Sequence, residues 1–520
     1  MLFNSLEFIF LFLPVSLVGF YFLAARSHTI AIAWLGFASL FFYGFWSPYS
    51  LPILVISICC NYYLGSKISD TKIQSRHVWL FFAVTLNLIL LAYFKYFNFF
   101  IENANALRIT FGLQPIAFLN IVLPIGISFF TFTQIAFLMD CHQNQVQEKS
   151  FLNYILFVSF FPHLIAGPII HHKEMMPQFA DRSIGRLNYS KISLGLVIFS
   201  IGLSKKILIA DPLSIYADIL FDGVQSNLVP ELFLSWLGSL AYTFQLYFDF
   251  SGYSDMAIGL ALLFGIWLPI NFNSPFKALN IIDFWQRWHM TLTRYINMYL
   301  YTPITLRFAR IGANYSHTFG LLFSLAIPTI VIFLILGLWH GASWNYVLFG
   351  AMHGCFVILN HLYRMLLSSP KKRNTSSHKY SFLKQSASWA LTFLAVNAAF
   401  VVFRADSLGD AIKIFQGMVG WNGFTLPMFV SPYLGSIAEY GNWLQIPAVF
   451  SSFTLLFLLF ISFALVLLAP NTASLSESAD ARSPKLSYLN HPVSALLLGT
   501  LFALCIANFS KTSSFLYFQF

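Results

Sequence analysis

The sequence predicts an all-α, polytopic transmembrane protein with about eleven to thirteen membrane helices, and two observations carry this prediction. The first is composition: 58% of the residues are hydrophobic and only 9% are charged, whereas a soluble domain carries about 25% charged residues. The second is pattern: apolar stretches of about 20 residues recur from Leu6–Ala24 to Val493–Ala507. A soluble core cannot enclose this much apolar surface, so lipid must cover it.

The first apolar stretch and the loop charges predict the topology. No cationic segment precedes Leu6–Ala24 and no small-residue cleavage site accompanies it, so we expect a retained helix rather than a signal peptide. Cationic loops stay on the cytoplasmic side of a membrane. Arg26 and His28 follow the first helix, which places the N-terminus outside, and the later loops place the C-terminal tail, residues 510–520, outside the cytoplasm as well. We expect residues 1–520 to form a single integral membrane domain.

Charge, cysteines and the histidine pair exclude several other classes of function. The net charge of +10 comes from residues scattered among loops, so we expect no nucleic-acid partner. The five cysteines form no CxxC pair, which predicts neither a disulfide framework nor a zinc site. His171 and His172 are adjacent rather than four residues apart, so an interfacial loop is favoured over a pair of metal ligands, and we expect no metal.

Ionisable residues interrupt the apolar stretches between about residues 120 and 365. Asp249, Asp255, His289 and His340 are among them. Such groups cost several kcal/mol at membrane depth unless they face a partner or a wet cavity. We therefore predict re-entrant or interfacial helices around a central tunnel; a loop or interfacial position is the alternative for some of these residues.

The segment Leu338–Trp344, LWHGASW, places His340 near the junction of two apolar helices. The indole of Trp339 would supply an apolar wall with a hydrogen-bonding edge. An imidazole in this setting can accept a proton near neutral pH. Gly337 and Gly341 have the spacing of a helix-packing motif. A structural histidine in an apolar helix is the alternative.

A second segment, Asp283–His289, reads DFWQRWH and predicts an amphipathic helix. Trp285 and His289 fall on one helical face, and Arg287 falls off it. The functional interpretation is that His289 reaches the same cavity as His340. The alternative is a helix at the membrane interface, where Trp and Arg are common.

A third segment, Tyr247–Asp255, reads YFDFSGYSD and is followed by NFNSPF, which contains Asn273. Polar residues alternate with aromatic ones in both runs, and a proline ends any helix at Pro275. This pattern favours a lined cavity or a buried polar network. The residues predicted to line the tunnel are Tyr247, Asp249, Asp255, Asn273, Trp285, Arg287 and Trp339.

These segments carry a resemblance to a known family. Asn271–Thr302 reads NFNSPFKALNIIDFWQRWHMTLTRYINMYLYT and is followed by LGLWHGASWNYVLFGAMHG. Together with Phe160–Pro168, Val402–Ala405, the opening MLFNSLEFIFLFLP and the last six residues, they resemble the membrane-bound O-acyltransferase (MBOAT) family, in its alginate O-acetyltransferase branch. The teichoic acid D-alanyl transferase is similar too. The resemblance spans nearly the whole chain in order.

The resemblance implies an O-acyltransferase whose catalytic core is residues 120–365. The family's essential histidine maps to His340 and its second histidine to His289. Four positions depart from the family pattern: Gln286 stands where Arg is expected, His163 where Gln is expected, and Asn297-Met298 where Arg-Asp is expected. The two histidines are retained, so these departures bear on acceptor, donor or partner preference rather than on the chemistry.

The resemblance also implies the substrates and partners. The donor is acetyl-CoA or another acyl thioester in the cytoplasm, with no tightly bound cofactor. The acceptor is an extracellular polysaccharide such as alginate. An extracytoplasmic esterase-like (SGNH-type) partner passes the acyl group to this polysaccharide. The protein itself is expected in the inner membrane of a bacterium. His340 is expected to act as a general base, worth roughly 10²–10⁴-fold. His289, Arg287 or Asn273 would orient the thioester or stabilise the oxyanion.

The C-terminal tail suggests a covalent carrier. Phe515, Tyr517 and Phe520 place a phenol between two hydrophobic anchors, and the tail resembles the terminal motif of the small partner peptide in teichoic acid D-alanylation. In this interpretation Tyr517 accepts the acyl group, and His340 acts as its base because an unperturbed tyrosine has a pKa of about 10. An aromatic tail anchored at the interface is the alternative.

Three alternatives to O-acetylation remain. A lipid-linked sugar transporter would also place polar groups at membrane depth, but it would tolerate His340→Gln. A non-enzymatic scaffold would support acylation without either histidine. A third alternative keeps the family chemistry but transfers D-alanine or another acyl group to a cell-wall polymer.

Overall fold

The computed structural model describes residues 1–314, 320–367, 382–423, 453–472, 474, 492–509 and 515–516. Within these ranges it contains helices and no strands, which confirms the predicted all-α class. Seven helical segments there are long and apolar enough to cross a membrane: His28–Trp46, Leu51–Ser69, Arg76–Thr110, Tyr189–Gln225, Leu322–His340, Trp344–Leu366 and Phe382–Arg404. Three shorter apolar helical segments are Phe8–Ala24, Phe453–Leu468 and Pro492–Ala507. The chain is therefore a multi-pass membrane protein.

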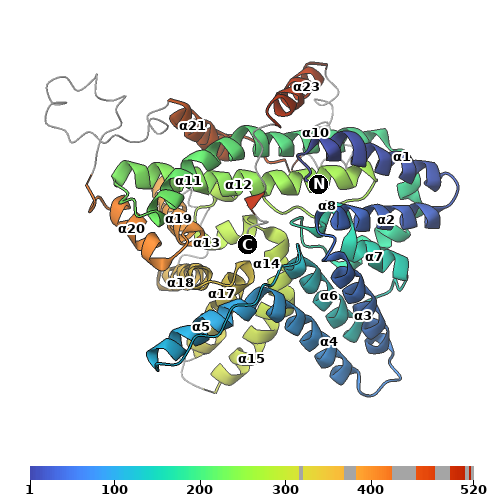
Figure 1. Cartoon of the computed structure of the whole chain (residues 1–520), viewed down its shortest axis with the longest axis horizontal. Helices are drawn as coiled ribbons and strands as arrows, with labels where there is room; N and C mark the ends of the chain where they lie inside the picture. Colours follow the sequence, from blue (N-terminus) through green and yellow to red (C-terminus); the bar gives the residue numbers. More distant parts are fainter. Residues whose placement is uncertain are drawn as a thin grey trace. The chain divides into compact units, whose positions relative to one another are not determined.

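Residue contacts divide the chain into two compact units, each assembled from separated segments. The first unit comprises Met1–Ser204, Gly252–Ile270 and Thr472–Phe520. Its helices (Figure 1) are η1 (Phe8–Phe12), α1 (Leu13–Ala24), α2 (His28–Trp46), α3 (Leu51–Ser69), α4 (Arg76–Leu91), η2 (Ala92–Tyr96), α5 (Phe97–Thr110), α6 (Ile127–His142), α7 (Phe151–Ser159), α8 (Phe161–Leu164), α9 (His172–Ala180), η3 (Arg182–Gly185), α10 (Tyr189–Ser204) and α23 (Pro492–Ala507).

The second unit comprises Lys205–Ser251 and Asn271–Asn471. Its helices are η4 (Lys205–Ala210), α11 (Asp211–Gln225), η5 (Pro275–Lys277), α13 (Ile281–Arg287), α14 (Met290–Ile296), η6 (Asn297–Tyr301), α15 (Thr302–Gly312), η7 (Leu322–Ala326), α17 (Ile327–His340), α18 (Trp344–Leu367), α19 (Phe382–Arg404), α20 (Leu408–Met418) and α21 (Phe453–Leu468). The long helix α12 (Leu232–Leu263) contributes residues to both units.

Close backbone contact joins α17 to α18 in the second unit. A Cβ atom on Gly337 would collide with the backbone of Tyr346, and one on Gly350 would collide with the backbone of Phe333. Only glycine allows this approach, so the helix-packing role expected of Gly337 is confirmed. The hairpin places His340, at the end of α17, beside the first turns of α18.

Aromatic side chains join α12, η5, α19 and α21 in the same unit. The ring of Phe244 lies 5.9 Å from Phe276, 6.1 Å from Phe393 and 4.6 Å from Phe463, measured between centroids. Such offset and edge-to-face pairs add to the burial of large apolar surfaces. This cluster holds in place the part of the second unit that carries Tyr247, Asn271 and Asn273.

Candidate functional site

His340 lies at the C-terminal end of α17 and is nearly buried, with 9% of its surface exposed. Its ring centroid is 5.8 Å from Phe349 of α18 and 5.2 Å from Phe403 of α19, both edge-to-face. The neighbouring Trp339 ring lies 4.8 Å away. Aromatic rings from three helices, α17, α18 and α19, thus surround the imidazole. The LWHGASW segment predicted only the ring of Trp339 on α17.

His289 lies between two short helices rather than inside one. The sequence predicted a continuous amphipathic helix from Asp283 to His289, and that prediction is wrong, because α13 ends at Arg287 and α14 begins at Met290. His289 adopts a left-handed conformation with φ of 45°, which an ordinary residue rarely adopts. This turn directs the ring into the protein, where 1% of the residue is exposed.

The two histidines meet at one tryptophan. The Trp339 ring centroid is 6.1 Å from that of His289 and 4.8 Å from that of His340. Phe250 contacts the other side of the His289 ring at 4.8 Å. The interpretation that both histidines belong to one site is supported by this geometry, although the two residues are 51 positions apart in the sequence.

Asn271 fixes the tautomer of His289. Asn271 Oδ1 lies 2.9 Å from His289 Nδ1 and accepts hydrogen bonds from the hydroxyl and backbone N–H of Thr291, at 2.8 and 3.4 Å. A backbone N–H can only donate, so the Asn271 atom is the carbonyl oxygen and His289 Nδ1 carries the proton. His289 Nε2 is therefore the unprotonated nitrogen, and it has no hydrogen-bond partner among the described residues.

The sequence reasoning did not single out His353, which lies in the quoted run ending AMHG. Trp285 Nε1 donates a hydrogen bond to His353 Nδ1 at 3.2 Å, and His353 is fully buried on α18. The His353 ring also lies 4.7 Å from Phe349, which in turn contacts His340. Trp285 therefore connects α13 to the wall of the His340 site. The sequence signal that could have identified His353 is a third histidine inside an apolar helix.

Arg287 and Asn273 have structural partners. Arg287 Nε donates to Asp283 Oδ1 at 2.7 Å, in an i,i+4 ion pair about one third exposed. Its guanidinium also reaches the Asn273 carbonyl at 3.4 Å, and the Asn273 side chain accepts from Asn471 at 3.3 Å. These contacts brace the turn before α13.

A buried ion cluster accounts for Asp249. Lys206 Nζ lies 2.6 Å from Asp249 Oδ1 and 2.7 Å from Asp211 Oδ1, and all three side chains are almost fully buried. The sequence reasoning singled out neither Lys206 nor Asp211. A lysine within an apolar stretch could have indicated a buried ion pair. Tyr247, two residues before Asp249, packs instead on the rings of Phe248, Phe272, Phe276 and Trp288.

Asp255 belongs to the other compact unit. Its Oδ2 accepts a hydrogen bond from the hydroxyl of Thr472 at 2.8 Å. Tyr517 lies outside the described residues. Its neighbour Phe515 is buried, and the Phe515 ring packs edge-to-face on Tyr253 at 4.8 Å.

The structure brings Asp140 to the histidine pair. Asp140 Oδ2 is 3.1 Å from His171 Nε2 and 2.9 Å from His172 Nδ1, and the three groups are close enough to hold a metal ion. The backbone N–H of Lys173 donates to His171 Nδ1 at 3.3 Å, so the proton of that ring is on Nε2 and points to Asp140. In a metal-ligating histidine, the nitrogen that faces the metal is unprotonated and the other ring nitrogen donates a hydrogen bond. The contacts of His171 therefore favour a hydrogen-bonded cluster over a metal site. The sequence pointed to the two histidines of this cluster but not to Asp140.

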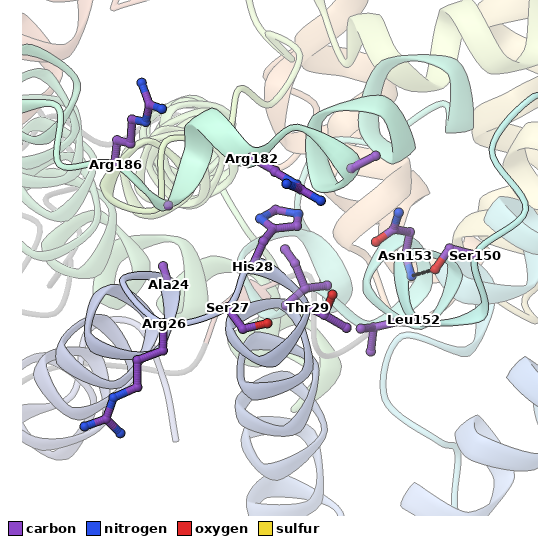
Figure 2. Close-up of a pocket in the computed structure, with 13 residues that line it drawn as sticks. Ala24, Arg26, Ser27, His28, Thr29, Ser150, Leu152, Asn153, Arg182 and Arg186 are labelled. Carbon is purple, nitrogen blue, oxygen red and sulfur yellow. Dashed lines mark hydrogen bonds between the residues drawn. The ribbon is translucent and has the colours of Figure 1, made fainter.

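Each unit contains a cavity. In the second unit a cavity of about 220 Å³ lies among α13, α14, α17 and α18, and its lining includes Trp285, Gln286, Asn297, Leu336 and His361. Two of these, Gln286 and Asn297, are positions that depart from the family pattern. In the first unit a cavity of about 590 Å³ has a polar and basic lining (Figure 2).

Comparison with known proteins adds information that the geometry lacks. Residues 55–402 match the family model described as "MBOAT, membrane-bound O-acyltransferase family". The chain is 40% identical to "Peptidoglycan O-acetyltransferase" of Helicobacter pylori, over 100% of this chain and 98% of that relative. It is 36% identical to "Probable alginate O-acetylase AlgI" of Pseudomonas aeruginosa, over 82% and 76% of the two chains. "Teichoic acid D-alanyltransferase" of Bacillus subtilis is 28% identical over 45% and 58%.

Proposed function

Because this chain belongs to the membrane-bound O-acyltransferase family, we propose that it moves an acetyl group from a cytoplasmic thioester across the membrane, for O-acetylation of an extracellular glycan. The chain is an O-acyltransferase; the acetyl group, the acceptor and the direction are the proposal. The supporting observation is that the similarity to a peptidoglycan O-acetyltransferase extends over the whole chain.

Peptidoglycan is the first acceptor to test and alginate the second. The peptidoglycan relative is 40% identical over the full length, against 36% over 82% of the chain for the alginate relative. The test is mass spectrometry of muropeptides and of exopolysaccharide from cells with and without this protein. We expect acetyl esters on muropeptides to disappear without it. Unchanged acetylation of both polymers would contradict the proposal, and a D-alanyl ester would support the alternative acyl group.

The chemistry proposed for His340 is general-base catalysis. His340 removes the proton of the acceptor hydroxyl, the oxygen attacks the thioester carbonyl carbon, and the carbon–sulfur bond breaks as the thiolate recovers the proton. Since His289 presents an unprotonated Nε2, its neutral form accepts rather than donates at that atom. We therefore propose that His289 positions the acceptor by accepting a hydrogen bond from a donor other than the hydroxyl that His340 deprotonates, in place of the oxyanion role.

The donor and the partner follow from where the reactants lie. Acetyl-CoA or another cytoplasmic thioester supplies the acyl group, and the protein needs no resident cofactor for this transfer. Since the glycan is outside the cell, an extracytoplasmic esterase-like protein would complete its acetylation. A bacterial inner membrane is the compartment that gives access to both sides.

Replacement of Asn271 by Ala is expected to lower acyl transfer by roughly 10- to 100-fold, the range known for partners that orient metal-ligating histidines through the same kind of hydrogen bond. The substitution leaves His289 free to change tautomer, so Nε2 no longer faces the site unprotonated. The measurement is glycan acetylation at equal membrane levels of protein. Thr291→Val is the matched control, because it removes another hydrogen bond to Asn271 Oδ1 and leaves the contact with His289. Equal activity of the two variants would contradict the positioning role.

Replacement of Tyr517 by Phe tests the covalent carrier proposal. The change keeps an aromatic ring at position 517 and removes the phenolic oxygen on which that side chain would carry the acyl ester. We expect loss of glycan acetylation with normal amounts of protein in the membrane. Normal acetylation would end the carrier proposal and leave the tail as an anchor, without touching the proposed role of His340.

A further inference from the structure

We propose that the basic cavity of the first unit binds the phosphate of an anionic phospholipid headgroup. The cavity has a volume of about 590 Å³ and is lined by the connection between α1 and α2, the start of α7, and the segment from the end of α9 through η3 to Arg186. No residue of this cavity has a role in the acyl transfer proposed above, so the proposal stands apart from the proposed function.

The charge of the lining favours an anion. Arg26, Arg182 and Arg186 line the cavity, and Asp and Glu are absent from its described lining residues. Within the described part of the chain these three arginines form no ion pair. Figure 2 shows the Arg182 guanidinium beside the His28 ring, whereas the guanidinium groups of Arg26 and Arg186 point away from that pair. Arg182 is therefore the cation that faces His28.

The nearest acid on the chain is engaged locally. Asp181, which precedes Arg182, accepts hydrogen bonds from the backbone and hydroxyl of Ser183 and so begins η3. These hydrogen bonds hold the pKa of the Asp181 carboxyl below its usual range. The Asp181 carboxylate stays ionised next to Arg182 and interacts with His28, but Asp181 itself is not among the lining residues of the cavity.

The start of α2 adds unsatisfied donors to the same cavity. Ser27 precedes the helix in an extended conformation and makes no side-chain capping hydrogen bond, and the first turn carries no acid. Ser27, His28 and Thr29 all line the cavity. The first N–H groups of a helix have no partner within the helix and favour an anion such as phosphate. This helix is 19 residues long, so its dipole is fully developed.

Contacts between elements hold this cavity open in a defined shape. His28 Nε2 is 2.9 Å from the carbonyl of Phe179, which ties the start of α2 to α9. A Cβ on Gly185 would lie 2.9 Å from that of Ala24, so η3 approaches the end of α1 as closely as a glycine allows. The fold therefore fixes the backbone of this cradle, and the side chains of Arg26, Arg182 and Arg186 extend from it to the exposed surface.

The apolar surface that leads to the cavity indicates that the bound phosphate belongs to a lipid. Val15, Val18 and Phe22 form a row on α1 and are each more than half exposed, as expected of a face covered by acyl chains. The guanidinium of Arg26 lies over the Phe22 ring at 4.3 Å and also lines the cavity. An amphiphile can therefore lay its tails along this row, past Arg26, and place its phosphate beside Arg182. A soluble phosphorylated thioester would share only the phosphate contacts.

The test is native mass spectrometry of the full chain in detergent with added phosphatidylglycerol, phosphatidylcholine or coenzyme A. We expect phosphatidylglycerol to bind more tightly than phosphatidylcholine, and R26Q/R182Q to weaken it roughly 25-fold, at about fivefold per arginine near a membrane surface. R310Q is the matched control, because Arg310 is an exposed arginine of α15 in the second unit. Monodisperse gel filtration of each variant shows that it is folded.

Two results would overturn the proposal. Equal phosphatidylglycerol affinity in wild type, R26Q/R182Q and R310Q would show that the cavity is not the lipid site. Displacement of the lipid by equimolar coenzyme A, with R26Q/R182Q losing coenzyme A binding, would assign the phosphate contacts to a soluble ligand instead.

Discussion

We expect His340→Ala to lower the proposed glycan acetylation by roughly 10²–10⁴-fold, the contribution of a positioned general base. The imidazole lies among Phe349, Phe403 and Trp339, and none of these neighbours can replace it as a base. The measurement is the acetyl ester content of the glycan at matched membrane levels of wild type and variant. Substantial residual acetylation at normal expression would remove His340 from the mechanism.

A more conservative change separates this outcome from loss of packing. His340→Gln keeps a polar side chain of similar size but cannot act as a base near neutral pH. We expect it to be as inactive as His340→Ala. A transporter would tolerate the glutamine, and a scaffold would support acetylation even in H289A/H340A, so activity in either variant would favour the corresponding alternative.

Lys206→Met produces the largest loss of stability that we expect in this chain. The change leaves the carboxylates of Asp211 and Asp249 buried without their shared cation, at 7% and 2% exposure. Removing one partner of a buried ion pair costs about 3–5 kcal/mol. We expect a lower apparent melting temperature and less protein in the membrane.

Two further variants make this expectation specific. Lys413→Met removes an exposed ion pair with Asp410, for which a loss of about 1 kcal/mol or less is expected. The triple variant K206M/D211N/D249N removes all three charges and is expected to recover most of the stability, because neutral groups leave no buried charge uncompensated. If Lys206→Met melts at the same temperature as Lys413→Met, the cluster does not stabilise the fold.

The site shows which functional residues can be predicted from local sequence patterns and which cannot. The LWHGASW segment locates His340, because tryptophans and small residues around a histidine in an apolar run are visible locally. The same reasoning gave the wrong helix around His289, because a left-handed residue between α13 and α14 is chosen by tertiary contacts such as the Asn271 hydrogen bond. The sequence does not show the partners of His353 and of Lys206, because Trp285 and Asp249 lie more than 40 positions away from them.

By itself the sequence determined that the chain is helical, crosses the membrane many times and carries the O-acyltransferase signature, because apolar length and local motifs are properties of neighbouring residues. Only the tertiary structure decided that Trp339 contacts both histidines, that Asp249 pairs with Lys206 and that Asp140 joins the histidine pair. The physical reason is that buried polar groups must find partners, and the folded chain brings those partners from distant positions.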